Sequence, residues 1–396
     1  MMHIVMNRLM AARKKAPDIV KRIDSQLSNI IEDTSVQLDL SHMTVNISAF
    51  KYNSPVVIVS DKANYFISYY QEKATLSSTT ATNWLIERDM ADPSICYIKS
   101  EVPSSHGRQY LGAPNSDNNV YLYTSRSHFT QWKISLLKRN HFELTYVGQK
   151  FDPTQVQLVI ARYAEDTRWA RAYRDIAIVY NKGLYHNTLD TLNVVEVENV
   201  GREGHTYLHH MITAYDSLKD RTIFAQGDPF THNDTFLYAI DNYEKLDPVM
   251  PLGLGYLVNS NLPPQYLLDK IKKLTGYGLE YAVFKINKNI DYTVENYFHD
   301  GGAQRFAPWY RSYYNIDPSL SVIDSMLQRS KFPYLPNDTL YFTFSGLFSV
   351  NREVIKAHDI EVYKNLKDEL LSENNQGGVN GYLLERLWLH IFKYSA

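Results

Sequence analysis

One stretch of the sequence, residues 199–230, constrains the fold more than any other. It reads NVGREGHTYLHHMITAYDSLKDRTIFAQGDPF, and its glycine-rich turn at 201–204 opens a segment with apolar residues at helical spacing. The segment leads into the apolar run Thr222–Ala225, which is broken by Gln226, Gly227, Asp228 and Pro229. Such a run is typical of a strand buried in a parallel sheet, whose carboxyl edge is where ligands bind. The pattern therefore predicts that Asp228 stands at a ligand-binding edge.

Two further apolar runs precede this stretch and extend the same pattern. QVQLVIARY covers residues 155–163 and DIAIVYNKG covers residues 175–183, each bounded by turn residues. Strands that alternate with helical segments at this spacing along the sequence predict an α/β sheet. We therefore expect an α/β domain over residues 151–396.

Residues 42–150 differ in character and predict a separate all-β domain. Short alternating segments are divided there by turn residues, and TNWLIE (82–87) and TQWKIS (130–135) share Thr-x-Trp-x-Ile. The repeat, with QWK at 131–133, weakly resembles a β-trefoil of the ricin-lectin or fascin kind. That resemblance implies a carbohydrate-binding domain. The simpler interpretation is that Trp84 and Trp132 anchor the hydrophobic core of the domain.

The first 41 residues predict a helical segment. Residues 17–33 carry apolar residues at helical spacing, which favours packing against a neighbour or self-association. The basic start lacks the pattern of a secretory signal, and no apolar run approaches the length of a membrane span. We therefore expect a cytoplasmic protein.

Composition excludes other classes. The formal net charge of −2 provides no overall positive electrostatic field that would attract nucleic acid. The single cysteine, Cys96, excludes an internal disulfide framework. The sequence also has no Gly-x-x-x-x-Gly-Lys and no Gly-x-Gly-x-x-Gly, so it does not predict a phosphate-loop NTPase or a dinucleotide-binding protein.

Three separated motifs suggest a family. The VGREGH turn, the QGD strand end and the late GYLLERLWLHIF segment are similar, over about residues 158–393, to an uncharacterised GT-A glycosyltransferase-like family of bacteria, fungi and large DNA viruses. The resemblance implies a C-terminal GT-A-like α/β domain that moves a sugar from a nucleotide sugar to a glycan or other hydroxyl acceptor. It also implies metal assistance by Mn²⁺ or Mg²⁺.

The resemblance assigns roles to particular residues. Glu385 would be the base or acceptor anchor, and Asp228 with His390 would hold the metal. The nucleotide sugar would contact residues along the predicted strand edge and the glycine turn, namely Ala161, Arg162, Tyr163, Arg202, Gln226 and Gly227. The acceptor would contact the aromatic loop residues Trp309, Tyr310 and Arg311.

Other interpretations stay open. A catalytically inactive carbohydrate-binding or structural protein, associated with the virion if the source is viral, is the main alternative. A hydrolase using Asp228, His232 and Asp234 lacks a visible nucleophile signature. The two central acids also have structural explanations. Asp228 would cap a turn, and Glu385 would pair with a neighbouring surface charge.

Overall fold

The computed structural model describes most of the chain from the first strand onward. The described residues are 42–47, 50, 52–60, 66–70, 73–77, 81–117, 119–138, 140–233, 236–253, 283–287, 311–337, 339–343, 346–372 and 378–392. The helical segment predicted over residues 1–41 lies outside them, as do Trp309, Tyr310 and Asp234.

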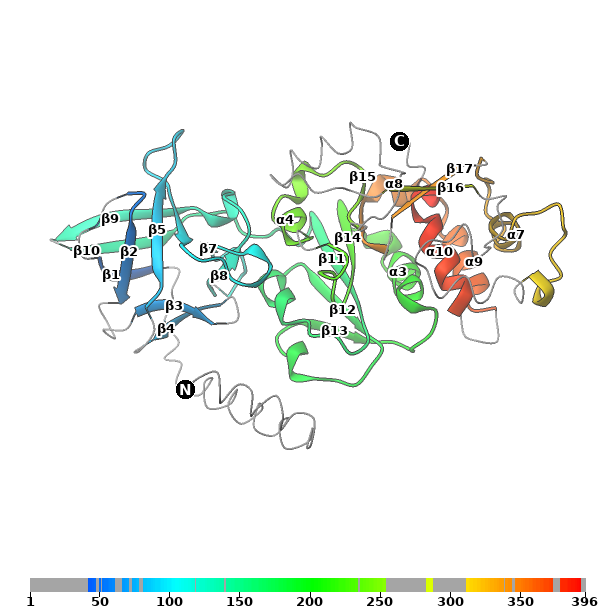
Figure 1. Ribbon diagram of the computed structural model, residues 1–396, viewed down its shortest axis with the longest axis horizontal. Coiled ribbons are helices and arrows are strands. Elements are labelled where there is room, and N and C mark those ends of the chain that lie inside the picture. The colour runs from blue at the N-terminus through cyan, green and yellow to red at the C-terminus, as the bar shows by residue number, and fades with distance from the viewer. Residues whose placement is uncertain are drawn as a thin grey trace, which may run out of the picture.

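The N-terminal part is a closed antiparallel barrel of six strands (Figure 1). Around the ring they are β1 (His42–Ile47), β10 (His141–Tyr146), β9 (Trp132–Lys138), β6 (Cys96–Ser100), β5 (Asn83–Arg88) and β2 (Pro55–Ser60). The ring closes because β2 pairs with β1. Two hairpins extend it, β3 (Phe66–Tyr70) with β4 (Lys73–Ser77), and β7 (Tyr110–Gly112) with β8 (Tyr121–Tyr123).

The Thr-x-Trp-x-Ile repeat marks two equivalent places in this barrel. Trp84 on β5 and Trp132 on β9 are both fully buried. Their indole N–H groups donate to the carbonyls of Ile67 and Leu111, each at 2.9 Å, and so tie each hairpin to the barrel. The interpretation of both tryptophans as core anchors is confirmed. The described part of residues 42–150 holds two hairpins, so the expected trefoil is corrected to a closed six-stranded barrel.

A six-stranded mixed sheet follows the barrel. Its order is β13 (Asn193–Glu196), β12 (Ala177–Asn181), β11 (Val156–Arg162), β14 (Arg221–Gln226), β18 (Phe348–Asn351) and β15 (Val249–Pro251). The pairings from β13 to β14 are parallel, whereas β18 runs antiparallel to both of its neighbours. Apolar side chains project from both faces, which explains the nearly continuous apolar runs of β11 and β14.

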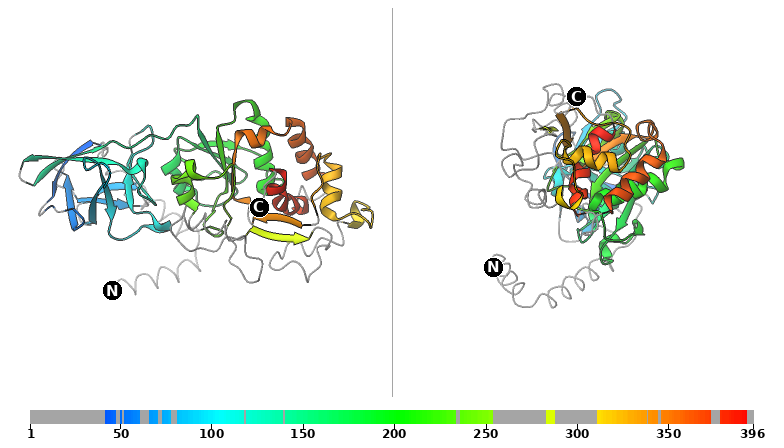
Figure 2. Two further views of the ribbon diagram at one scale, coloured as in Figure 1. Left: turned by 90° about the horizontal axis from the view of Figure 1, so that it is seen from above. Right: turned by 90° about the vertical axis from the view of Figure 1, so that its right-hand side faces the viewer.

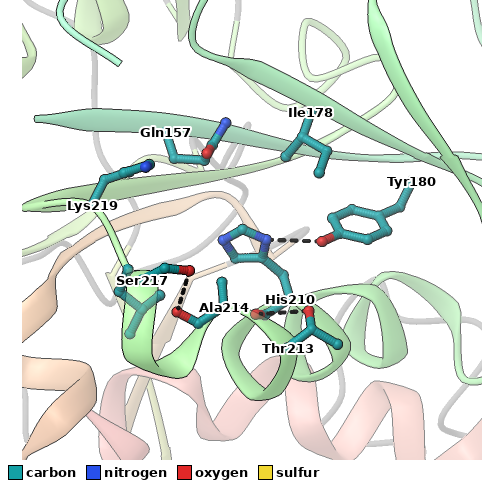
Figure 3. Close-up of a pocket in the computed structure, with 9 residues that line it drawn as sticks. Gln157, Ile178, Tyr180, His210, Thr213, Ala214, Ser217 and Lys219 are labelled. Carbon is teal, nitrogen blue, oxygen red and sulfur yellow. Dashed lines mark hydrogen bonds between the residues drawn. The ribbon is translucent and has the colours of Figure 1, made fainter. Parts of the chain in front are cut away.

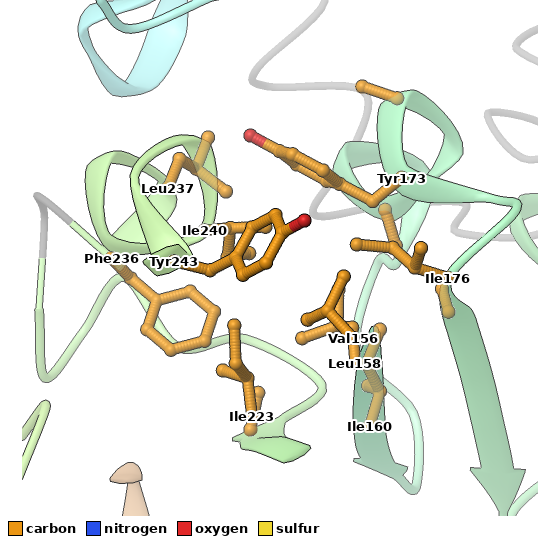
Figure 4. Close-up of a cluster of buried hydrophobic side chains, with 14 of the residues drawn as sticks. Val156, Leu158, Ile160, Tyr173, Ile176, Ile223, Phe236, Leu237, Ile240 and Tyr243 are labelled. Atoms are coloured by element: carbon orange, nitrogen blue, oxygen red, sulfur yellow. The ribbon is translucent and has the colours of Figure 1, made fainter. Parts of the chain in front are cut away.

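Each face of the mixed sheet packs against a different set of elements. On one face lie the helices α3 (Arg202–Thr213), α9 (Ile360–Leu370) and α10 (Gly378–Ile391), with α7 (Val322–Arg329) beyond them and α8 (Arg352–Lys356) following β18. On the other lie α4 (Phe236–Asp241) and the 3₁₀ segment η3 (Arg168–Tyr173), as Figure 4 shows. β16 (Val283–Asn287) and β17 (Thr339–Thr343) form a separate pair.

Short 3₁₀ turns complete the described structure. They are η1 (Ser105–Gly107), η2 (His128–Thr130), η4 (Asn187–Leu189), η5 (Tyr215–Ser217) and η6 (Tyr243–Lys245). Within the described ranges, no helix has both the length and the apolar character needed to cross a bilayer.

The predicted fold class, with a GT-A-like α/β domain over residues 151–396, is wrong. The described structure is mostly β, begins with a closed barrel and has few helices. The physical reason lies in the connections: β11 reaches β12 through η3, and β12 reaches β13 through η4, so neither crossover carries an α-helix. In the segment AEDTRWARAYR the chain forms η3, which buries the rings of Trp169 and Tyr173 against the sheet.

The barrel and the mixed sheet share a core. Tyr123 on β8 and Phe129 on η2, both from the N-terminal part, belong to the same buried cluster as Val156 and Ile223 of the sheet. The barrel Arg108 donates to the Trp169 carbonyl at 2.9 Å, and both side chains are buried. Figure 2 shows the two parts side by side along the long axis of the molecule. They are therefore in direct contact through apolar and polar side chains.

Candidate functional site

The carboxyl edge of the parallel strands gathers several of the predicted residues. Ala161 on β11 pairs in register with Gln226 on β14, so both strands end at one edge. Arg162 is 3% exposed, and its guanidinium donates to Asn181 Oδ1 at 2.6 Å and to the Leu184 carbonyl at 3.0 Å. Arg162 therefore fixes the edge, whereas Tyr163 is exposed there.

The turn after β14 is held from two sides. Asp228 is half-buried, and its Oδ1 accepts the backbone N–H of Phe230 at 3.1 Å, so it does cap the turn. Trp169 donates its indole N–H to the Gly227 carbonyl at 2.9 Å. The ring of His106, from the barrel turn η1, stacks on Phe230 with centroids 3.5 Å apart. The barrel thus contributes to the wall beside Asp228.

Glu385 lies within electrostatic range of this turn. Burial lowers the pKa of His232, and the negative charges of Glu385 and then Asp228 oppose that shift. Both acids therefore lie close enough to His232 to influence its ionisation. Because Asp228 and Glu385 are 157 positions apart in the chain, only the folded structure brings them to one histidine.

Glu385 also forms a carboxylate pair with Glu203. Glu203 lies in the first turn of α3 and Glu385 in α10, and both are buried. Burial and the negative charge of Glu385 together raise the pKa of Glu203 to about 7, against the opposing effects of Arg202 and Lys182. Arg386 lies 3.3 Å from Glu385 and supplies a buried positive charge. The Glu203 carboxyl group is therefore partly protonated near pH 7.

Two buried hydrogen-bond donors adjoin the carboxylate pair. Tyr207 and Trp388 are both 0% exposed, and within the described part of the chain neither the Tyr207 hydroxyl nor Trp388 Nε1 has a hydrogen-bond partner. A Cβ on Gly346 would lie 3.3 Å from the Tyr207 ring, 3.5 Å from Glu203 Cγ and 3.7 Å from Trp388 Nε1. The three side chains thus surround one point beside the Gly346 backbone.

Positive charge gathers at the start of α3. Lys182 Nζ donates to the Val200 carbonyl at 2.6 Å and to the Arg202 carbonyl. Burial lowers the pKa of Lys182 to about 8, with Glu203 opposing the shift. Arg202 lies 4.2 Å from the Tyr382 ring centre and donates to the Tyr382 hydroxyl at 3.0 Å. Both cations lie next to Glu203 at the amino end of α3, which itself favours anions.

The predicted metal ligands are not assembled. His390 Nε2 lies 3.3 Å from the Tyr334 carbonyl, and the His390 ring packs on Phe332. Across the described ranges, no group of three His, Cys, Asp or Glu side chains could hold a metal ion. Mn²⁺ or Mg²⁺ therefore stays a prediction, and the chemistry proposed below is derived from the protein's own side chains.

Of the predicted acceptor residues, Arg311 is described. It donates to the Leu320 carbonyl at 3.1 Å and so braces the turn that precedes α7. Sequence reasoning did not select Glu203, Tyr207, Trp388 or Lys182 as site residues. A usable signal did exist, because Glu203 and Glu385 are both acids at predominantly apolar or small positions of their helices, in VGREGH and LLERLW.

Comparison with known proteins gives one match. Residues 158–251 match a family described as "Protein of unknown function (DUF3431)". The match spans about a quarter of the chain, from β11 to β15, and it includes Glu203, Asp228 and His232 but not Glu385. The search of curated proteins found no match.

The predicted resemblance to a GT-A glycosyltransferase-like family is therefore wrong. The matched family carries no activity in its description, and no glycosyltransferase family matches the chain. The closed barrel and the 3₁₀ connections of the mixed sheet contradict the resemblance in structure. Any function has to be argued from the side chains themselves.

Proposed function

We propose that this chain is an acid–base enzyme that transfers a glycosyl group from a nucleotide sugar to a hydroxyl acceptor. The observation that carries the proposal is the burial of Glu203 within electrostatic range of Glu385. Burial and the charge of Glu385 together raise the pKa of Glu203 to about 7. Two neighbouring carboxyl groups are suited to glycosyl chemistry, in which one acts as acid and the other as base. The adjacent cations suit an anionic leaving group.

The two carboxyl groups take different roles. Glu385 lies 3.3 Å from the guanidinium of Arg386, and in this proposal it accepts the proton of the acceptor hydroxyl. The acceptor oxygen forms a bond to the anomeric carbon while the bond from that carbon to the donor phosphate breaks. Glu203, protonated, donates a hydrogen bond to the departing phosphate oxygen. The proton thus moves to Glu385 and the electron pair leaves with the nucleotide.

Arg202 and Lys182 would balance the charge of that leaving group. Both lie at the amino end of α3 beside Glu203, and Lys182, with a pKa of about 8, is mostly protonated at pH 7. Fixed cations aimed at developing negative charge stabilise a transition state without reorganisation. The negative charges of Glu385 and Asp228 both act on His232. In this proposal His232 helps to orient Glu385.

The alternative of an inactive carbohydrate-binding or structural protein has less support. Trp84 and Trp132, the aromatic residues of the repeat, are fully buried and cannot serve as sugar platforms. We keep this alternative as one outcome of the test. The cytoplasmic location and the glycan acceptor stay predictions.

The test is a screen of UDP-, GDP-, CMP- and dTDP-sugars on the full chain, following both melting temperature and release of nucleotide. We expect one donor to stabilise the protein and to be turned over, and Glu385→Gln to lower kcat by about 10²–10⁴-fold. Glu369→Gln is the matched control, because Glu369 is also buried and also has a pKa raised by burial. It pairs with Arg329 on α7 and should keep the activity within about twofold.

If no donor shifts the melting temperature or is turned over, the transferase proposal fails and the inactive alternative takes its place. If Glu369→Gln lowers kcat as much as Glu385→Gln does, the effect is one of stability, and the roles of the carboxylate pair are wrong.

A further inference from the structure

A pocket lies at the opposite end of α3 from the carboxylate pair. Its volume is about 210 Å³, and it is lined by β11 and β12, by the end of α3 and by the turn that leads to β14 (Figure 3). His210 in this pocket is seven residues beyond Glu203, or about 10 Å along the helix. The two places are therefore separate, and the second is not part of the proposed reaction.

One wall of the pocket is an ordered polar pair. The Tyr180 hydroxyl and His210 Nδ1 are 3.0 Å apart, and both residues are buried. Burial lowers the pKa of His210 to about 4, so the ring is neutral at pH 7. Tyr180 occupies one ring nitrogen, and Figure 3 shows the other on the side of the ring that faces Gln157 and Ser217. The free nitrogen of His210 is thus presented to the pocket.

The facing wall adds groups of mixed character. Gln157 donates its amide N–H to the Ile176 carbonyl at 2.6 Å, which fixes the side chain and leaves its oxygen as an acceptor. Ser217 is exposed, and its hydroxyl lies 3.3 Å from the Ala214 carbonyl. Lys219 contributes a half-buried ammonium group. Ile178 and Leu218 supply apolar surface between these polar groups.

The charge of the pocket disfavours an anion. It opens at the carboxyl end of α3, where the helix carbonyls carry a partial negative charge. Lys219 offsets this charge and also acts on Asp152, so the pocket has no surplus of positive charge. A neutral ligand with several hydroxyl groups suits this lining, because each hydroxyl both donates and accepts a hydrogen bond.

We propose that this pocket binds a single neutral sugar ring through Gln157, His210, Ser217 and Lys219. The ring hydroxyls would meet those side chains while the C–H groups of the ring contact Ile178 and Leu218. The volume lies below the roughly 300–1,000 Å³ of sites for larger ligands, which limits the occupant to one ring. The proposal does not depend on the transferase activity, because it uses no residue of the carboxylate pair.

The test is a titration of the full chain with glucose, galactose, mannose and N-acetylglucosamine, followed by two-dimensional NMR with isotope-labelled histidine. We expect one sugar to bind with a dissociation constant of about 1 mM and to shift the His210 ring signals. Lys219→Met and Ser217→Leu should each weaken that binding at least tenfold. Lys133→Met, an exposed lysine on the barrel strand β9, should leave it unchanged.

Two results would overturn the proposal. One is the absence of any His210 shift with all four sugars, and the other is equal binding by Ser217→Leu and the wild type. Glu385→Gln separates this site from the transferase site, since that variant should lose donor turnover but keep the sugar titration unchanged. Both Ser217 and Lys219 lie at least partly in solvent, so their substitution should leave the melting temperature within a few degrees of the wild type.

Discussion

The barrel and the mixed sheet differ most in how they treat ionisable side chains. In the barrel, hydrogen bonds from neighbouring groups lower the pKa of the surface carboxyls Asp89 and Asp92, so both stay charged and solvated. In the mixed sheet, burial moves Glu203 and Lys182 toward their neutral forms. Such shifts cluster at functional sites, and structural ion pairs such as Glu369 with Arg329 show them as well. The comparison supports placing the proposed acid–base chemistry in the mixed sheet rather than in the barrel.

The junction between the barrel and the mixed sheet contains an ionisable side chain in a third kind of environment. Asp241 on α4 is buried between the two parts, and burial raises its pKa. Its carboxyl group accepts from the backbone N–H of Thr124 at 2.8 Å, from the Thr124 hydroxyl at 2.6 Å and from the Tyr173 hydroxyl at 2.8 Å. The junction is thus tied by a satisfied buried acid, unlike the carboxylate pair, where one acid faces another.

The largest effect should come from the carboxylate pair. If Glu203 and Glu385 act as one unit, the double variant Glu203→Gln with Glu385→Gln should lose about 10²–10⁴-fold in kcat, no more than the worse single variant. Turnover of the donor found by the nucleotide-sugar screen measures this. Multiplied losses in the double variant would show that the two acids act independently and would remove the basis for a shared proton.

The two repeat tryptophans should show the structural role of the barrel. Trp84→Ala and Trp132→Ala should each lower the free energy of unfolding by about 3–5 kcal/mol, because each removes a fully buried indole and its hydrogen bond. Urea denaturation followed by circular dichroism measures the loss. Trp132→Phe is the milder control. Costs below about 1 kcal/mol would show that the two sites are not equivalent core anchors.

The junction should account for joint unfolding of the two parts. Asp241→Ala leaves the Thr124 and Tyr173 donors without their shared acceptor and should cost about 1–3 kcal/mol. We expect calorimetry to show one transition for the wild type and two for this variant, because only the shared apolar core then couples the two parts. A single unchanged transition would mean that the apolar contacts suffice.

The pH dependence should have opposite signs in the two parts. Because the pKa of Glu203 is raised in the folded protein, the folded state binds more protons than the unfolded state between pH 4.5 and 7. This carboxyl group should therefore lower stability by about 1–3 kcal/mol as pH rises through that window. For Asp89, whose pKa is lowered, stability should instead be lost as pH falls below its ordinary value of 3.8.

Denaturation curves from pH 3 to 7.5 measure both effects. Glu203→Gln should remove the loss above pH 4.5, and Asp89→Asn should remove part of the loss in acid. If Glu203→Gln leaves the curve above pH 4.5 unchanged, the pKa of Glu203 is not raised in the folded protein and the acid–base proposal loses its foundation.

Local patterns were reliable where one element determined the outcome. The apolar runs at 155–163, 175–183 and 221–226 all contain strands, and Asp228 does follow the end of β14. The Thr-x-Trp-x-Ile repeat correctly indicated two matching places in the all-β region. In each case the signal is the periodicity or length of one segment, which neighbouring segments do not alter.

The prediction for the fold of the C-terminal part was wrong for a different reason. Residues 164–174 and 184–192 connect parallel strands, a role that predicts helices, but the chain makes the crossovers with the 3₁₀ turns η3 and η4. Trp169 and Tyr173 of η3 instead bury their rings under the sheet. Packing of these large side chains against the shared core decided the local conformation, and no short window of sequence shows that core.

The sequence by itself determined which segments are strands, that an acid follows the strand at 221–226, and that two tryptophans occupy equivalent places. Only the tertiary structure decided that Glu203 meets Glu385 across 182 positions, and that His390 faces Tyr334 and Phe332 rather than Asp228. The physical reason is that ionisation depends on burial and on the nearest charges. Both are properties of the folded protein, not of any one segment.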